Sequence, residues 1–132
     1  MRKGLVAAFW LAAAPTAAQD LIDVPSGQPV TLQDVIWGEP GPEGLTARFR
    51  FIAPQIARDG GSVDFDTAIE DMDHLCNTYA LPRISTVTGP TPQQIVISLS
   101  DIPVPFGEMQ PEATQFFEAY AIEDNACIWE VF

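Results

Sequence analysis

Few side chains in this chain could do chemistry, and its single histidine comes first. His74 follows Glu70 by four residues and Asp71 by three, a spacing at which side chains meet on a helix. A histidine beside carboxylates could act as a general base or contact a ligand or ion. The helical periodicity of the segment, however, directs His74 away from the apolar side and into water, whereas catalysis needs a concave, partly dry site. We therefore predict no catalytic residue and interpret His74 as a solvated helix residue.

The acidic residues around His74 could in principle bind calcium weakly. They are Asp64, Asp66, Glu70, Asp71 and Asp73. Calcium takes about six to eight oxygen ligands from a curled loop with a glycine at the bend, and the segment that starts at Asp64 lacks this pattern. We therefore predict no metal site and no cofactor, and we interpret these carboxylates as a solvated helix face.

Two arginines, Arg48 and Arg50, alternate along one segment and would project from the same face of a strand. Such a pair could grip the carboxylate or phosphate group of a ligand. The chain holds 18 acidic residues against six basic ones, so cross-strand ion pairs are the use that we expect for these two side chains.

The two cysteines, Cys76 and Cys127, predict a disulfide, because an even number of cysteines in an exported domain argues for pairing. Closing a loop of roughly 50 residues would contribute about 4 kcal/mol to stability in the chain-entropy treatment. The bond would leave no free thiol as a nucleophile. No Ser–His–Asp spacing, phosphate-binding loop or dinucleotide fingerprint is present in the sequence either.

The N-terminus predicts export. Two positive charges in the first three residues precede the apolar run 5–14, and small residues follow it. This is the order of a secretory signal peptide, and the run is too short to span a bilayer, which needs about 20 residues. We predict that residues 1–18 are a signal peptide cleaved after Ala18. Residues 19–29 would form a flexible lead, and residues 30–132 a single domain in the periplasm or outside the cell.

The charge balance restricts the partners of this domain. The formal net charge of the chain is −12, and two of its six basic residues belong to the predicted signal peptide. A strongly acidic protein repels the phosphate backbone of nucleic acids and anionic membrane surfaces. No segment after the signal peptide has the length and apolarity of a membrane span. We therefore expect the partner to be an unidentified protein of the cell envelope.

The first half of the domain predicts two strands and a helix. Val30–Trp37 and Leu45–Phe51 are expected to form a hairpin, because the second segment alternates apolar and polar residues and turn formers separate the two. An amphipathic helix should begin at the N-cap Asp64 and end at Pro82. Cys76 lies within its apolar stripe and would face the sheet.

The second half predicts three more strands. Gln94–Leu99 is rich in β-branched residues, whereas 102–111 contains three prolines and cannot be a regular central strand. Segments 116–123 and 127–132 flank a plausible tight turn and predict a hairpin. The resulting order, ββαβββ, predicts a two-layer α+β fold in which one amphipathic helix covers a mostly antiparallel sheet of about five strands.

Five stretches carry a resemblance that spans nearly all of the domain. They are SGQPVTLQDVIWGEPGP, FRFIAP, DMDHLCNTYALPRI, QQIVISLSDIPVPFGE and PEATQFFEAYAIEDNACIWEVF, of which the last is the most specific. The chain resembles a family of small, uncharacterised exported proteins of alphaproteobacteria, defined as a domain of unknown function. The resemblance implies a shared fold and both cysteines, and it supplies no catalytic residues.

Three hypotheses for the function follow. The first is a non-enzymatic exported protein that acts by binding a protein partner. The second is a module that binds a small ligand or a metal ion through the acidic helix face or the Arg48 and Arg50 pair. The third is an unrecognised hydrolase that uses His74.

Overall fold

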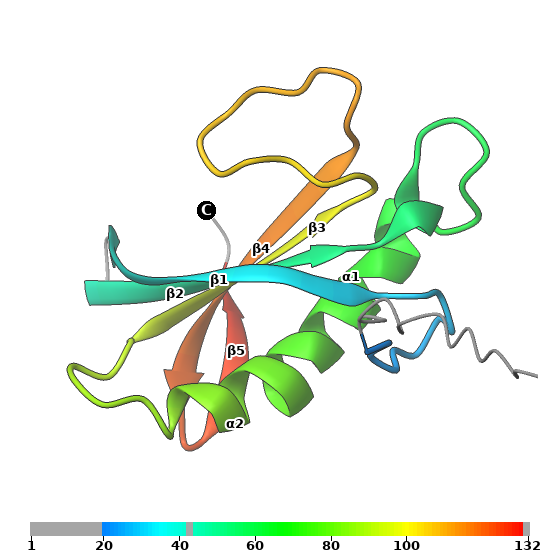
Figure 1. Ribbon diagram of the computed structural model, residues 1–132. Helices are drawn as coiled ribbons and strands as arrows, with labels where there is room; N and C mark the ends of the chain where they lie inside the picture. Colours follow the sequence, from blue (N-terminus) through cyan, green and yellow to red (C-terminus); the bar gives the residue numbers. More distant parts are fainter. Residues whose placement is uncertain (1–19, 42–43, 131–132) are drawn as a thin grey trace, which may run out of the picture.

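One helical layer packs against a five-stranded sheet in the computed structural model, which describes residues 20–41 and 44–130 (Figure 1). The strands are β1 (Thr31–Gly41), β2 (Gly44–Ile52), β3 (Gln94–Ser100), β4 (Gln115–Glu123) and β5 (Ala126–Glu130). The helical segments are η1 (Pro54–Ile56), α1 (Phe65–Leu75), η2 (Cys76–Ala80) and α2 (Leu81–Ile84). The predicted α+β fold with one helix on a mostly antiparallel sheet is confirmed. The predicted signal peptide and the last two residues of the predicted final strand lie outside the described residues.

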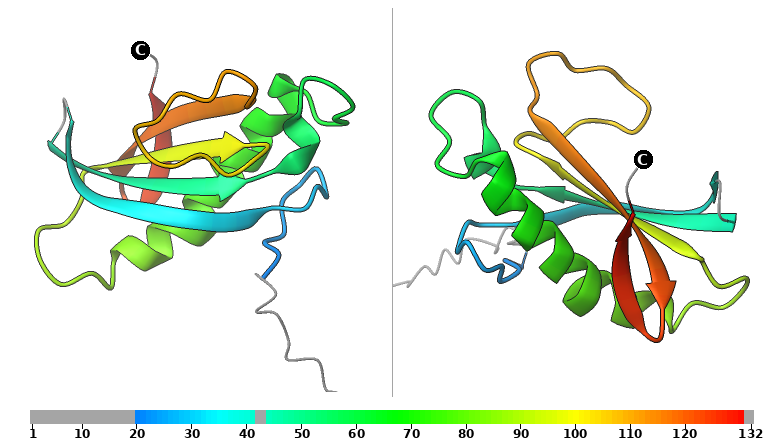
Figure 2. Two further views of the ribbon diagram at one scale, coloured as in Figure 1. Left: turned by 45° about the horizontal axis from the view of Figure 1, so that its top comes forward. Right: turned by 180° about the vertical axis from the view of Figure 1, so that it is seen from behind.

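The strands follow one another across the sheet in the order β1-β2-β3-β4-β5. Strands β2 and β3 are parallel, and the other three pairs are antiparallel. The parallel pair follows from the connection between them, because a helical crossover carries the chain back to the end of the sheet where β2 began. Figure 2 shows α1 on one face of the sheet and the β3–β4 connection on the other.

The core lies between α1 and the sheet. Alternate residues of β2 and β3 face the helix and are buried: Ala47, Phe49, Phe51, Ile95, Ile97 and Leu99. From the helix, Met72 and Leu75 are fully buried against them. Each such side chain contributes roughly 1.5–3 kcal/mol by leaving water. The alternation read from 45–51 is therefore confirmed, with Arg48 and Arg50 on the opposite face of β2.

The helix begins as predicted and ends later than predicted. The carboxylate of Asp64 accepts a 2.9 Å hydrogen bond from the Thr67 backbone N–H, and this bond lowers the pKa of Asp64. The prediction that Pro82 ends the helix is wrong, because the π-helical turn η2 and the short α2 follow α1. Pro82 lies in the first turn of α2, where a proline is tolerated because its missing N–H has no helical partner to lose.

The C-terminal hairpin and the disulfide are both found where the sequence placed them. Asp124 and Asn125 form the tight turn between β4 and β5, with φ values of 51° and 60°. Aspartate and asparagine tolerate this left-handed backbone, which a two-residue hairpin turn of this type requires. Cys76 and Cys127 are bonded, with Cα atoms 6.2 Å apart, and the bond joins the end of α1 to the start of β5.

The expected flexible lead is instead attached to the helix over its described part. The Ser26 backbone N–H and hydroxyl and the Gln28 amide all donate hydrogen bonds to the side chain of Asp71. Val24 is buried in the same core as the helix, and the Ile22 N–H bonds to the Val30 carbonyl. The turn formers in this segment describe only its local conformation. They could not predict these hydrogen bonds, because the acceptor, Asp71, lies 45 residues further along the chain than Ser26.

Candidate functional site

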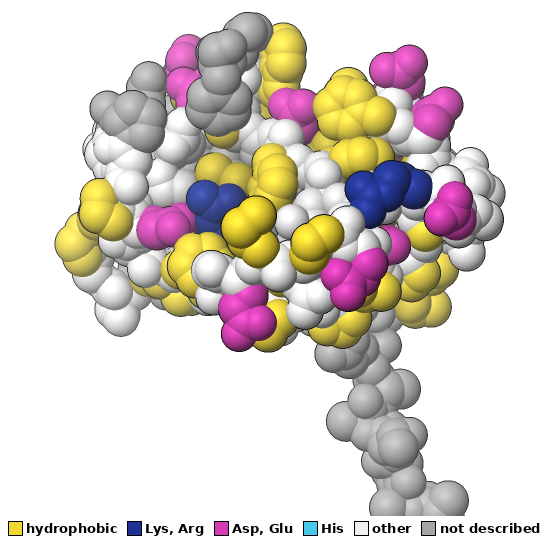
Figure 3. All heavy atoms as spheres, turned by 90° about the horizontal axis from the view of Figure 1, so that it is seen from above, with side chains coloured by type: hydrophobic (Ala, Val, Ile, Leu, Met, Phe, Trp, Pro, Cys, Tyr) yellow, Lys and Arg dark blue, Asp and Glu magenta, His cyan; other side chains and the backbone are white. Residues whose placement is uncertain are grey.

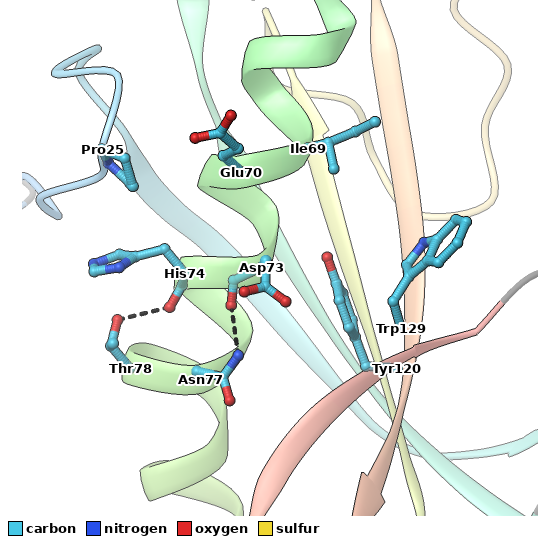
Figure 4. A pocket seen from close by; sticks show the side chains of 9 residues that line it. All are labelled: Pro25, Ile69, Glu70, Asp73, His74, Asn77, Thr78, Tyr120 and Trp129. Atoms are coloured by element: carbon cyan, nitrogen blue, oxygen red, sulfur yellow. Dashed lines mark hydrogen bonds between the residues drawn. The ribbon is translucent and has the colours of Figure 1, made fainter.

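A cleft with a volume of about 730 Å³ extends across α1 and η2, from Pro25 on one side of the helix to Tyr120 and Trp129 of strands β4 and β5 on the other (Figure 4). It is lined by Pro25, Ile69, Glu70, Asp73, His74, Asn77, Thr78, Tyr120 and Trp129. Residues 69–78 come from α1 and η2 and form a ridge, and the two aromatic residues come from neighbouring strands. A concave site with apolar walls and a few polar groups is the usual form of a binding site.

Tyr120 is the most unusual residue of the cleft. It lies on the helix-facing side of β4, only 1% of its surface is exposed, and its hydroxyl has no hydrogen-bond partner among the described residues. Burial raises the pKa of Tyr120, and the nearby charges of Asp73 and Glu118 raise it further. The hydroxyl is therefore neutral at physiological pH. Buried hydroxyls are almost always hydrogen-bonded, so an unpaired one beside a cleft points to a missing partner.

A second buried atom without a partner is the Gln28 side-chain carbonyl, but Gln28 does not line the cleft. The amide of the same side chain is bonded to Asp71 at 2.7 Å, which fixes Gln28 in a structural contact. Tyr120 has no comparable contact through its hydroxyl. Figure 4 shows the Tyr120 ring directed into the space between the helix and Trp129.

Trp129 forms the outer wall of the cleft. It is the cross-strand neighbour of Tyr120, and 52% of its surface is exposed. Its indole N–H donates a 2.5 Å hydrogen bond to the carboxylate of Glu118, a residue that is otherwise buried. The bond fixes the orientation of the indole, so its exposed surface is held in place rather than free to rotate.

The helical wall is held just as firmly. The Asn77 side chain accepts a 3.0 Å hydrogen bond from the Cys127 backbone N–H and donates another of 3.0 Å to the Asp73 carbonyl. The neighbouring disulfide, Cys76–Cys127, joins the same two elements covalently. Asn77 and Cys76 belong to the π-helical turn η2, and such turns are frequent at functional sites. The cleft is therefore preorganised on both sides.

The charge of the cleft is negative. Glu70 and Asp73 line it, Glu118 lies behind the Trp129 indole, and no lysine or arginine is among the described lining residues. The carboxylates attract a cation, and the half-exposed indole of Trp129 adds cation–π attraction for a cation that reaches its face. The arrangement therefore suits an ammonium or guanidinium group.

His74 and Glu70 both line this cleft, which their spacing did not predict. His74 is half-buried rather than fully solvated, and Figure 4 shows its imidazole turned toward Pro25, away from Tyr120. The Thr78 hydroxyl donates to the backbone carbonyl of His74 at 2.7 Å, so this bond does not involve the imidazole. The expectation that His74 is fully solvated is therefore corrected, because this side chain is half-buried at the cleft.

Asp71 does not lie on a solvated face, and that expectation is wrong. It is 0% exposed, and its two carboxylate oxygens accept hydrogen bonds of 2.9, 2.5 and 2.7 Å from Ser26 and Gln28. A buried carboxylate needs such donors, because an unpaired charge would be costly to bury. Asp71 therefore anchors the N-terminal segment and lies apart from the cleft that Glu70 and His74 line.

Arg48 and Arg50 lie on the opposite face of the sheet and form the expected cross-strand ion pairs. Arg48 pairs with Glu39 at 3.0 Å, and Arg50 pairs with Asp34 at 2.9 Å. Both guanidinium groups also lie over the Phe106 ring, at 5.9 and 5.4 Å from its centroid. Arg50 donates in addition to the Val104 carbonyl, which ties the proline-rich connection to the sheet. Figure 3 shows this face, where basic, acidic and hydrophobic side chains are interspersed.

The described residues contain no group of three or more His, Cys, Asp and Glu side chains that could hold a metal ion. Within the same residues, no helix has the length and apolar character needed to cross a bilayer.

Tyr120 and Trp129 were missed by the sequence analysis. A signal for them was present, because Trp129 is two residues after Cys127 and so shares its face of the strand. Once Cys127 is bonded to the helix, that face must be the helical side. The unpaired hydroxyl, by contrast, has no signal in the sequence.

Comparison with known proteins gives one match. The family described as "Family of unknown function (DUF6497)" matches residues 6–132 of this chain. No curated protein and no solved structure matches it.

Proposed function

We propose, for a chain that belongs to this family of unknown function, a non-enzymatic role in which the cleft between α1 and β5 binds a cationic side chain of a protein partner. The observation that carries the proposal is the buried, unpaired hydroxyl of Tyr120 beside the half-exposed Trp129 and the carboxylate of Asp73. A lysine ammonium could donate to both oxygens and lie against the indole.

Several features support a partner outside the cytoplasm. The N-terminal pattern of charge, apolar run and small residues is typical of a signal peptide, and the Cys76–Cys127 bond suits an oxidising compartment. We propose that the protein acts in the periplasm or outside the cell. The net charge of −12 favours a basic partner surface, because opposite charges accelerate encounter and select the partner.

A second candidate is a free small amine as the ligand, and the volume of the cleft favours it. About 730 Å³ lies within the range of sites that hold whole small molecules. The hydrolase hypothesis has less support, because the imidazole of His74 is turned away from the unpaired hydroxyl of Tyr120 (Figure 4). Tyr120 is therefore not paired with this histidine as a nucleophile with its base, and the Thr78 hydroxyl donates to the His74 backbone carbonyl instead of the imidazole.

The proposal is tested by NMR titration of the oxidised, exported protein with N-acetyl-lysine amide. We expect the indole N–H signal of Trp129 to shift on titration, with a dissociation constant in the millimolar range. N-acetyl-norleucine amide, which has the same chain without the charge, serves as the matched control ligand. Equal shifts with both ligands, or none with either, would refute the proposed cation site.

Two variants locate the binding. Tyr120→Phe and Asp73→Asn are expected to weaken binding of the lysine derivative several-fold, because each removes one acceptor for the ammonium group. Asp66→Asn is the matched control, because Asp66 is an exposed acid in the first turn of the same helix and does not line the cleft. A loss of binding in Asp66→Asn equal to that in Asp73→Asn would mean that only the overall charge matters.

A further inference from the structure

The outer edge of strand β5 near Trp129 is the feature from which we infer how the partner binds. We infer that an extended basic segment of the partner adds to the edge of the sheet beside Trp129 and places one basic side chain in the cleft. This inference rests on the proposed function, and it adds the backbone conformation and the pattern of the segment that is recognised.

Strand β5 is an outer strand of the sheet and pairs with β4 alone. Its two-residue turn requires that Glu123 and Ala126 form a hydrogen-bonded pair, and such pairs then alternate along an antiparallel ladder. Ala126, Ile128 and Glu130 therefore direct their backbone groups toward β4. Cys127 and Trp129 direct theirs away from the sheet.

The first of these outward residues is already covered. The Cys127 N–H donates to the Asn77 side chain at 3.0 Å, which agrees with the alternation and shows that the helix end occupies this part of the edge. No hydrogen bond of the described residues involves the backbone of Trp129 apart from those within the hairpin. Within residues 20–41 and 44–130, the edge is consequently covered at Cys127 and uncovered at Trp129.

The other outer strand of the sheet is protected in a way that β5 is not. The β1–β2 pairing is interrupted twice, between Leu32 and Asp34 and between Ile36 and Glu39. Irregularities of this kind disturb an edge and hinder the addition of a further strand. The β4–β5 pairing runs without a shift, and 126–130 contain neither proline nor lysine, two residues that protect edges.

The side chains beside the open edge define the segment that fits. A strand beside Trp129 would direct alternate side chains to the cleft side, where Tyr120 and Asp73 lie. The remaining side chains would meet Ile128, which is 44% exposed on the opposite face, because Glu130 on that face accepts a 2.7 Å hydrogen bond from the Gln94 amide. The fitting pattern is therefore a basic residue alternating with apolar ones. A second copy of this chain is disfavoured as the occupant, because two chains that each carry a formal net charge of −12 would repel each other.

The probe is the acetylated, amidated pentapeptide VKVKV, compared with N-acetyl-lysine amide. We expect the peptide to bind at least tenfold more tightly and to slow hydrogen exchange of the Trp129 backbone N–H about tenfold, because strand addition supplies backbone hydrogen bonds. Two N-methylated versions of the peptide, each blocked along one edge, are the matched controls. At least one of these two peptides should bind no more tightly than N-acetyl-lysine amide, because it cannot form the backbone hydrogen bonds to β5.

The outcomes separate the two proposals. If the peptide binds no more tightly than the lysine derivative, strand addition is wrong and the cation site stands. If neither binds, the proposed function is wrong. A dimer whose Trp129 N–H is protected without any peptide would overturn the inference in favour of a second copy.

Discussion

The two flanks of helix α1 use the same residue type for opposite purposes. On one flank, the carboxylate of Asp71 is completely buried, and three hydrogen bonds from Ser26 and Gln28 occupy its oxygens. On the other flank, Asp73 is exposed at a cleft, opposite the unpaired hydroxyl of Tyr120. The acids are two residues apart, so they project from different sides of the helix.

This difference shows how structural and binding sites can be told apart. A polar group whose partners are all within the chain stabilises the fold and has no capacity left for a ligand. A buried group left without a partner costs free energy, and this cost is offset when a ligand supplies the missing bond. By this criterion, Asp71 belongs to the fold, and Tyr120 belongs to the cleft.

Removing the disulfide should have the largest effect, because the bond holds the cleft flank to β5. We expect the double variant Cys76→Ser and Cys127→Ser to lose about 4 kcal/mol of unfolding free energy, as a loop of this length predicts. Urea denaturation with circular dichroism measures the change. An unchanged midpoint would mean that the hydrogen bond from Cys127 to Asn77 and the packing suffice to hold this flank.

The anchored flank should respond strongly to the loss of its carboxylate. Asp71→Ala is expected to cost about 2–3 kcal/mol, because the buried donors of Ser26 and Gln28 lose their acceptor. Asp73→Ala is the matched control on the open flank, and it should change stability by less than about 0.5 kcal/mol. Thermal denaturation of both variants tests the contrast. Equal losses would remove the distinction between the flanks.

Tyr120 permits a pH test of the open flank. Because its pKa is raised in the folded state, the unfolded chain loses this proton first, starting near the ordinary value of 10.0. Stability should therefore be fully present below pH 10 and decrease as the pH rises above it. Tyr120→Phe should reduce this decrease, and at pH 7 it should raise stability by about 1–3 kcal/mol, because the substitution removes a buried hydroxyl that has no hydrogen bond to lose. A large loss at pH 7 would show that the hydroxyl has a partner.

The smallest effect is expected at Asp64, at the start of the helix that both flanks share. The hydrogen bond from Thr67 lowers the pKa of Asp64 below its ordinary 3.8, so the carboxylate stabilises the helix above that pH. The contribution is lost as the pH falls through the lowered value. Asp64→Asn keeps a capping side chain that does not titrate. The melting temperature of this variant should lie below that of the unaltered chain at neutral pH. The difference should shrink as the pH falls through the lowered pKa of Asp64.

Much of the fold was predictable from local patterns. Alternation in 45–51, the N-cap at Asp64 and the turn at 124–125 each involve residues that are neighbours in the chain. The ion pairs of Arg48 and Arg50 were predictable as well, because a hairpin brings its two strands together locally. The attachment of the segment around Ser26 was not predictable, because the acceptor of its hydrogen bonds is Asp71, which the sequence analysis placed on a solvent-exposed face of the helix.

The sequence by itself determined the main strands and the helix of this protein and their order, because these depend on residues that are close in the chain. It also determined the pairing of the cysteines, because a chain with two cysteines offers a single pair. The tertiary structure alone decided which side of α1 each acid faces and that the Tyr120 hydroxyl has no partner in the described part of the chain. Those properties depend on how α1 packs on the sheet, where the helix contacts β3 and β4 and Met72 and Leu75 are fully buried in the core.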